Sequence, residues 1–115
     1  MWPATEAALV EEQRTLAAAP APRWQPAEGP LHLGGCWVCF PRGLSGPGEA
    51  GDPAWAAAVT LRSGRQTGRY VETGVAAAAY VPGLMALRAG GLLESVVRGL
   101  PGRPDVLLLD ATGRD

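Results

Sequence analysis

The two cysteines of the chain lie in the motif Cys36-Trp37-Val38-Cys39, a spacing that could suit a redox pair or a zinc site. The residues around the motif alternate as in a β-strand, and residues three apart on a strand point to opposite faces. A redox pair also needs its first cysteine at a helix N-terminus, where the thiolate is stabilised. A zinc site needs four ligands, and His32 is the single histidine of the chain. We therefore expect both cysteines to be reduced and structural.

A second candidate is Asp110, which closes the apolar run Val106-Leu107-Leu108-Leu109. Such a run is typical of a buried parallel strand, and ligands bind at the carboxyl end of parallel strands. A carboxylate is costly to bury there unless it serves a metal, an ion pair or a helix cap. Two roles therefore remain open for Asp110: a metal or catalytic role, and an N-cap for Ala111-Thr112-Gly113.

The third candidate is the segment Tyr80-Val81-Pro82-Gly83. Pro82 fixes its own φ and pushes Val81 toward extended geometry, and Gly83 then lets the backbone turn into a helix. This turn holds Tyr80 at an edge. There its ring could stack on a flat ligand, or it could plug the end of a strand.

Other motifs that carry chemistry are absent from the sequence. It has no glycine-rich phosphate loop, no serine nucleophile elbow and no second histidine for a triad. The remaining acids look like solvated surface residues, among them Glu49, Asp52, Glu72 and Glu94.

Hydrophobic periodicity predicts the elements that position these candidates. A helix, three strands, a second helix and a final strand are expected over residues 5–19, 33–40, 55–61, 65–72, 84–100 and 106–110. Ser63-Gly64 is a tight-turn signal that makes the middle strands a hairpin. The segment 33–40 is apolar on both faces, which predicts a central strand covered on both sides. Gly90-Gly91 predicts a kink in the second helix, or two short helices.

Length and composition limit the class of protein. The 115 residues suit one domain, with 47% hydrophobic residues for a core and many loops from 16 Gly and 11 Pro. A net charge of −1, with ten arginines and no lysine, predicts neither a strong nucleic-acid footprint nor a membrane surface. No apolar run reaches a membrane span, and no signal peptide opens the chain. We expect a cytoplasmic protein.

Several blocks of the sequence occur in the order seen in endonuclease V. They are Trp2-Pro3 with Glu12-Gln13 and Leu16, Gly35-Cys36-Trp37-Val38, Ala56-Ala57-Ala58-Val59, Tyr80-Val81-Pro82-Gly83-Leu84 with Arg88, and Pro104-Asp105-Val106-Leu107-Leu108-Leu109-Asp110-Ala111-Thr112-Gly113. The chain resembles the first half of that family's domain over nearly its whole length. The resemblance implies an α/β, ribonuclease H-like mixed sheet. It also implies a DNA-repair hydrolase that uses Mg²⁺ to cleave DNA near deoxyinosine or RNA near inosine. We expect a single domain over residues 1–115, with the N-terminal helix and proline-rich connector in 1–30 and the sheet core in 31–115.

The resemblance also assigns site residues. Tyr80, Val81 and Pro82, followed by Gly83, match the block that acts as a wedge at the lesion, although its first proline is Ala79 here. Asp110 matches a metal-site carboxylate. Trp37 and Ala89 stand where the family has a catalytic aspartate and a glutamate. In a ribonuclease H-like fold the strand at residues 33–40 would lie parallel to and beside the strand at 106–110, which would place Trp37 near Asp110. Because Mg²⁺ needs several oxygen ligands, the resemblance implies weak metal binding at Asp110 and impaired catalysis.

Three functions remain open. The chain could be an incomplete, inactive endonuclease V-like domain, or a non-catalytic module that binds nucleic acid or protein on the same scaffold. It could also be an active enzyme with a rearranged metal site that uses Glu72 or Asp115. The chain stops at Asp115, before the His-Pro-Arg that follows in the family. We therefore expect the last strand to leave an open edge and apolar surface, which would favour self-association or a covering partner.

Overall fold

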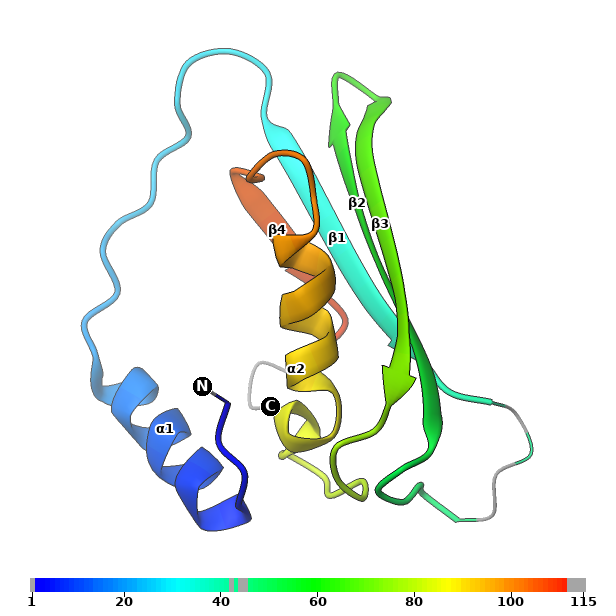
Figure 1. The fold of residues 1–115 in the computed structure, drawn as a ribbon. Coiled ribbons are helices and arrows are strands. Elements are labelled where there is room, and N and C mark those ends of the chain that lie inside the picture. The colour runs from blue at the N-terminus through cyan, green and yellow to red at the C-terminus, as the bar shows by residue number, and fades with distance from the viewer. Residues whose placement is uncertain (1, 42, 44–45, 112–115) are drawn as a thin grey trace.

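The computed structural model describes residues 2–41, 43 and 46–111 of the chain. Its helices and strands follow the order α1 (Glu6–Ala18), β1 (His32–Cys39), β2 (Pro53–Arg62), β3 (Arg65–Val75), α2 (Met85–Arg98) and β4 (Val106–Leu109). The four strands form one sheet in the order β3-β2-β1-β4 (Figure 1). β4 runs parallel to β1, whereas β1–β2 and β2–β3 are antiparallel. The predicted α/β mixed sheet is confirmed.

The hairpin between β2 and β3 turns where the sequence predicts. Ser63 and Gly64 both have positive φ, 51° and 74°. A two-residue turn with both central residues at positive φ has the twist that suits antiparallel strands. The strands extend beyond the predicted ends, to Pro53 on one side and Val75 on the other.

α2 lies along one face of the sheet because the residues beneath it are small. Ala54, Ala56, Ala58 and Thr60 form a buried row along β2. The core joins Ala56 and Ala58 to Cys36 of β1 and Val96 of α2. Small side chains on the sheet let a helix approach closely, so that larger helix residues fill the space between the layers.

The helix is continuous, so the predicted break at Gly90-Gly91 is wrong. A Cβ atom added at Gly90 would lie 2.6 Å from the indole of Trp2, whereas one at Gly91 would meet nothing within 4 Å. The Trp2 indole N–H donates to the Glu94 carboxylate one turn further along. Gly90 is therefore a point of close packing for the N-terminal segment, and packing of α2 on the sheet keeps the helix regular.

The expectation that β1 is covered on both sides is also wrong. His32, Gly34 and Cys36 are buried on the side of α2, but Trp37 is 55% exposed on the other side. The strand registers place further partly exposed side chains on that same side of the sheet. We call this side the open face: Leu33, Trp37, Trp55, Leu61, Val71, Val75 and Leu108.

α1 lies beside the N-terminal end of α2, with residues 19–31 running as an extended connector to β1 (Figure 1). Thr5 caps the helix, because its hydroxyl accepts the backbone N–H of Ala8 at 3.2 Å. The apolar residues of α1 are not all covered: Leu9 is buried, but Leu16 is 65% exposed. Gln13 Nε2 donates to the Gly83 carbonyl at 2.9 Å, which joins α1 to the turn before α2. No helix in the described part of the chain has the length and apolarity needed to cross a membrane.

Candidate functional site

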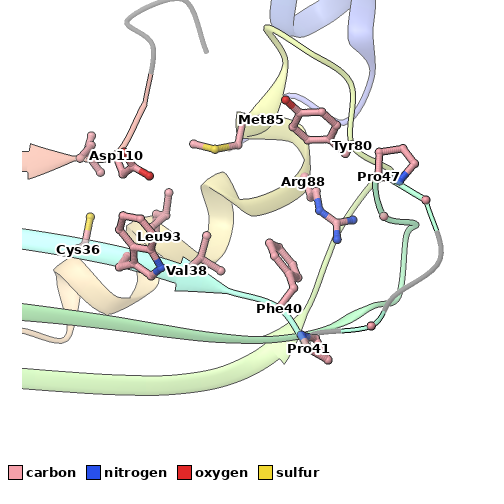
Figure 2. A pocket seen from close by; sticks show the side chains of 15 residues that line it. Cys36, Val38, Phe40, Pro41, Pro47, Tyr80, Met85, Arg88, Leu93 and Asp110 are labelled. Atoms are coloured by element: carbon pink, nitrogen blue, oxygen red, sulfur yellow. The ribbon is translucent and has the colours of Figure 1, made fainter.

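A cavity of about 430 Å³ lies where the parallel strands β1 and β4 end. It is lined by the end of β1, the following loop, the turn before α2, the first turns of α2, and the end of β4. Figure 2 shows Tyr80, Arg88 and Phe40 gathered on one side of this cavity and Asp110 on the other. Carboxyl ends of parallel strands are a common location for ligand sites.

The structure brings Asp110 and Trp37 to the same cavity. The last paired residues of the two parallel strands are Cys36 and Leu109, so Trp37 and Asp110 occupy the next position on each strand. Both side chains line the cavity. Trp37 is more than half exposed, and its side chain forms a wall of the cavity.

The donors around Asp110 do not fit a Mg²⁺ site. Its neighbours in the cavity wall include the apolar or sulfur-containing side chains of Met85, Leu93 and Leu109. Across the part of the chain that the structure describes, no three His, Cys, Asp or Glu side chains gather as a metal group would. Ala89 is buried one helical turn from both Met85 and Leu93, on the helix side that meets the cavity. Mg²⁺ requires near-octahedral oxygen coordination, which these side chains do not supply.

The alternative acids do not complete the site. Glu72 lies on β3, across the sheet from β4, where its carboxylate accepts the Ser95 hydroxyl at 2.5 Å. It is absent from the described residues that line the cavity. Asp115, and the Thr112 and Gly113 of the proposed cap, lie outside the residues that the structure describes.

Tyr80 lies on a tight turn between β3 and α2. Gly83 has φ of +81°, and the Leu84 N–H donates to the Val81 carbonyl at 3.0 Å. Tyr80 is 44% exposed and lines the cavity. The expected strand-to-helix turn is present, and one side of the tyrosine is accessible to a ligand.

Sequence reasoning missed the role of Arg88, which is 4% exposed. Its guanidinium donates to the carbonyls of Glu49 and Ala78, at 2.9 and 3.0 Å, and pairs with Asp52 at 2.9 Å. It also lies 4.1 Å from the centre of the Phe40 ring, a cation–π contact. Apart from the place of Arg88 in the block that resembles endonuclease V, the signal in the sequence was a lone charge in the apolar run from Met85 to Leu93.

Asp52 is thus a structural acid, and the view of it as a solvated residue is wrong. The Arg88 hydrogen bond lowers the pKa of Asp52, and the backbone N–H of Glu49 lowers this pKa further. Glu94 is also engaged, because hydrogen bonds from Arg98 and then Trp2 lower its pKa.

The cysteines lie as the strand pattern predicts. Both are free, with Cys36 buried under α2 and Cys39 exposed on the opposite side. Burial raises the pKa of the Cys36 thiol, which disfavours the reactive thiolate.

The sheet order, the parallel β1–β4 pair and the covering helix define a ribonuclease H-like α/β fold, and solved structures agree. Endonuclease V from Streptomyces avermitilis superposes with a TM-score of 0.75 and 26% identity, over 96% of this chain and 46% of that one. The catalytic domain of human endonuclease V gives a TM-score of 0.70 and 27% identity, over 92% and 48%. A Ciona intestinalis endonuclease V, solved with a 24mer DNA that contains inosine, shares the fold at 17% identity, with a TM-score of 0.56 and coverage of 74% and 38%.

Comparison of the sequence with known proteins also finds an endonuclease V, over a shorter span of the chain. Endonuclease V from Natronomonas pharaonis is 36% identical over 63 residues, which are 55% of this chain and 25% of that protein. No family model matches the sequence. The chain is therefore similar to endonuclease V in both sequence and fold over the segment that it shares with these proteins. It spans about a quarter of the Natronomonas protein and about half of the solved Streptomyces and human chains.

Proposed function

We propose that this chain is an endonuclease V-like protein that binds DNA or RNA containing inosine, with Tyr80 contacting the bases. The observation that carries the proposal is the half-exposed Tyr80 at the edge of the cavity, in a chain whose sequence and fold match endonuclease V. An aromatic ring stacks on any nucleobase, and side chains that wedge between bases use that contact to offset unstacking. The rigid Pro82-Gly83 turn lowers the entropy cost of holding the ring ready.

The test is the affinity of the chain for a fluorescent duplex with one inosine, measured by anisotropy at fixed salt. Tyr80→Ala should weaken binding by about 1–3 kcal/mol, the usual contribution of one base–aromatic stack, and Tyr80→Phe should retain most of the affinity. Trp24→Ala is the control, because Trp24 is an exposed aromatic on the connector and does not line the cavity. Equal affinities for the Tyr80→Ala variant and the unmodified chain would contradict the proposal.

We propose further that the chain does not cleave nucleic acid through Mg²⁺ with the residues described. The identities of Trp37 and Ala89 support this, because an indole and a methyl group stand where the family has carboxylates. One carboxylate, Asp110, offers too few oxygen ligands to activate water and neutralise a leaving oxygen. The alternative, a rearranged active site, would need ligands from residues beyond those that line the cavity.

Incubation of inosine-containing DNA and RNA with the chain in Mg²⁺ or Mn²⁺ tests this second proposal. We expect no nick above the background given by heat-denatured protein. A defined product next to inosine that disappears with Asp110→Ala would establish the rearranged active site instead.

A further candidate function is self-association through the open face, with a second copy of the chain as the partner. Four strands at about 4.8 Å spacing present a face on the order of 500 Å², which approaches the roughly 800 Å² per partner of a standard interface. Charge placement supports a two-fold pair. At the strand positions of this face the charged residue is Arg69, on β3, and Asp110 follows β4 at the other edge of the sheet.

Arg69 and Asp110 also lie at nearly the same level along the strands. Arg69 is paired through Val59 and Gly35 to Leu108, and Asp110 is two residues further on. A two-fold axis along the strands places β3 of one copy over β4 of the other. That arrangement brings each Arg69 opposite the partner's acidic end and buries apolar side chains between them.

A further inference from the structure

We propose that Arg88 and Asp52 are positioning residues for Tyr80: their ion pair locks the loop after β1 against the turn that carries the tyrosine. The Gly48 loop is residues 46–52, and the Tyr80 turn is residues 76–83. The role of this lock in ligand binding rests on the proposed function, because Tyr80 is the residue assigned to contact bases. The lock itself is a property of the chain without any ligand.

Arg88 is the point where three segments meet. From its place in the first turn of α2, it reaches Asp52 and the Glu49 carbonyl in the Gly48 loop, at 2.9 Å each. It reaches the Ala78 carbonyl in the Tyr80 turn at 3.0 Å, and its planar group lies over the Phe40 ring at the end of β1. One buried side chain therefore connects the loop, the turn and the strand end.

The Gly48 loop also holds the Tyr80 turn directly through the backbone. The Tyr80 N–H donates to the Gly48 carbonyl at 3.3 Å. Ala76 exchanges two hydrogen bonds with the loop: its N–H donates to the Asp52 carbonyl and its carbonyl accepts the Gly51 N–H, both at 2.8 Å. The turn is thus hydrogen-bonded at two points, Ala76 and Tyr80, to a loop that Arg88 contacts from inside.

The lock depends on all of its parts because the guanidinium is buried. Across the described residues, no buried side-chain nitrogen or oxygen is without a hydrogen-bond partner. Removal of Asp52 would leave a buried positive charge without its counter-ion, and such a group moves or draws in water. Asp52 is itself held in place by the Glu49 N–H at 2.8 Å.

Gly48 is required by the close approach of Arg88. Its φ is +113°, and a Cβ atom added there would lie 2.5 Å from Arg88 Nη2. A methyl group would therefore push the guanidinium off the loop. Gly51 offers a matched control, because it has φ of +89° in the same loop but its Cβ would meet nothing within 4 Å. Both changes strain the backbone, and only Gly48→Ala reaches Arg88.

The lock lies at the ligand-facing end of the molecule. Phe40, Gly48, Tyr80 and Arg88 all line the same cavity, and Figure 2 shows the Arg88 guanidinium between the Phe40 and Tyr80 rings. Loss of the lock would therefore change the direction in which Tyr80 points before it changes the core beneath α2.

The first experiment measures amide hydrogen exchange in the free protein. Gly48→Ala and Asp52→Ala should speed exchange at Tyr80 and Ala76 at least about tenfold, since both lose charge-assisted or backbone hydrogen bonds, while Gly51→Ala changes them much less. Asp52→Asn keeps an oxygen acceptor and should give an intermediate effect, which provides a variant that folds if Asp52→Ala does not. Equal exchange in the Gly48→Ala and Gly51→Ala variants would overturn the lock.

The second experiment tests whether the lock acts through Tyr80, using the duplex with one inosine. Gly48→Ala should weaken binding by up to about 5- to 150-fold, the range expected for one lost stack. The double variant with Tyr80→Ala should bind no more weakly than Tyr80→Ala alone. Additive losses would overturn the positioning role, since a general loss of structure does not depend on Tyr80. If the unmodified chain binds no duplex while the exchange effect is present, the proposed function fails and the lock stands.

Discussion

Trp37 and Ala89 are apolar residues at positions where the resemblance to endonuclease V implies acids. Trp37 follows the last residue of β1 paired with β4, next to Asp110, and Ala89 lies on the helix side facing the cavity. With acids at both positions, three carboxylates would approach one point at the carboxyl end of parallel strands. Hard divalent cations bind where several oxygen ligands converge.

The double change Trp37→Asp with Ala89→Glu should therefore raise the affinity of the chain for Mn²⁺. Isothermal titration calorimetry should detect a site in the double variant that Asp110→Asn removes. Trp55→Asp is a suitable control, because it adds an acid to the same face in place of an exposed tryptophan outside the cavity wall. An unchanged Mn²⁺ affinity would show that these positions do not converge.

Asp52 makes the stability of the chain depend on pH in the acid range. Its pKa is lowered in the folded state, first by the Arg88 hydrogen bond and then by the Glu49 N–H. A carboxyl with a lowered folded pKa contributes its full stability above its unfolded value, near 3.9, and loses it as the pH falls through the folded value. Urea denaturation from about pH 6 to pH 2.5 should show unmodified chain and Asp52→Asn converging in stability at the acid end. A difference that stays constant over this range would contradict the linkage. Glu94 titrates in both proteins, so its contribution cancels in the comparison.

At the scale of elements, the two glycines of the continuous helix α2 have different surroundings. Gly90→Ala should destabilise the fold although alanine favours helices, because its Cβ would lie 2.6 Å from the Trp2 indole. Gly91→Ala, which points into open space, should stabilise the fold by about 0.5–1 kcal/mol. Urea denaturation measures both changes. In a Trp2→Ala background, Gly90→Ala should no longer destabilise the fold. A destabilisation that persists in this background would come from the backbone and not from contact with Trp2.

The elements were largely predictable from the sequence, and their long-range partners were not. Apolar alternation and the Ser63-Gly64 turn predicted the hairpin, and the apolar run before Asp110 predicted a parallel strand beside β1. These signals are local or depend on burial. The close packing at Gly90 could not be predicted, because it depends on Trp2, which is distant in the sequence and packs against α2 only in the folded state.

The candidate site was likewise predictable from the sequence only in part. The proximity of Trp37 and Asp110 followed from strand alignment, and the exposed Tyr80 turn followed from Pro82 and Gly83. The pairing of Arg88 with Asp52 did not, since a surface loop and a helix residue carry no local pattern that links them. The coverage of β1 was misjudged for a related reason. Apolar residues on both faces of a strand show which surfaces are favourable to bury. They do not show which element of the structure buries them.

At the scale of the whole molecule, the open face is the main apolar surface that remains exposed to solvent among the described residues. α2 covers one side of the sheet, while Trp37, Trp55 and Leu108 remain 55%, 44% and 64% exposed on the other. Isolated soluble domains rarely expose contiguous apolar patches of several hundred Å². At about 25 cal/mol per Å², burial of such a patch favours association by several kcal/mol before the entropy cost of binding is included.

We therefore expect the 115-residue chain to form dimers through the open face in solution. Sedimentation velocity over a wide concentration range should show a reversible shift from monomer to dimer. Because Arg69 lies opposite the acidic end of the partner copy in the proposed arrangement, Arg69→Asp should weaken the dimer, and the swap Arg69→Asp with Asp110→Arg should restore it. Arg65→Asp is the control: it changes the net charge equally, but its register places it on the side of the sheet that faces α2. A monomer at every concentration with a cooperative thermal transition would rule out the association. Equal effects of Arg69→Asp and Arg65→Asp on dimer formation would instead mean that net charge alone governs the association. That result would contradict the two-fold arrangement.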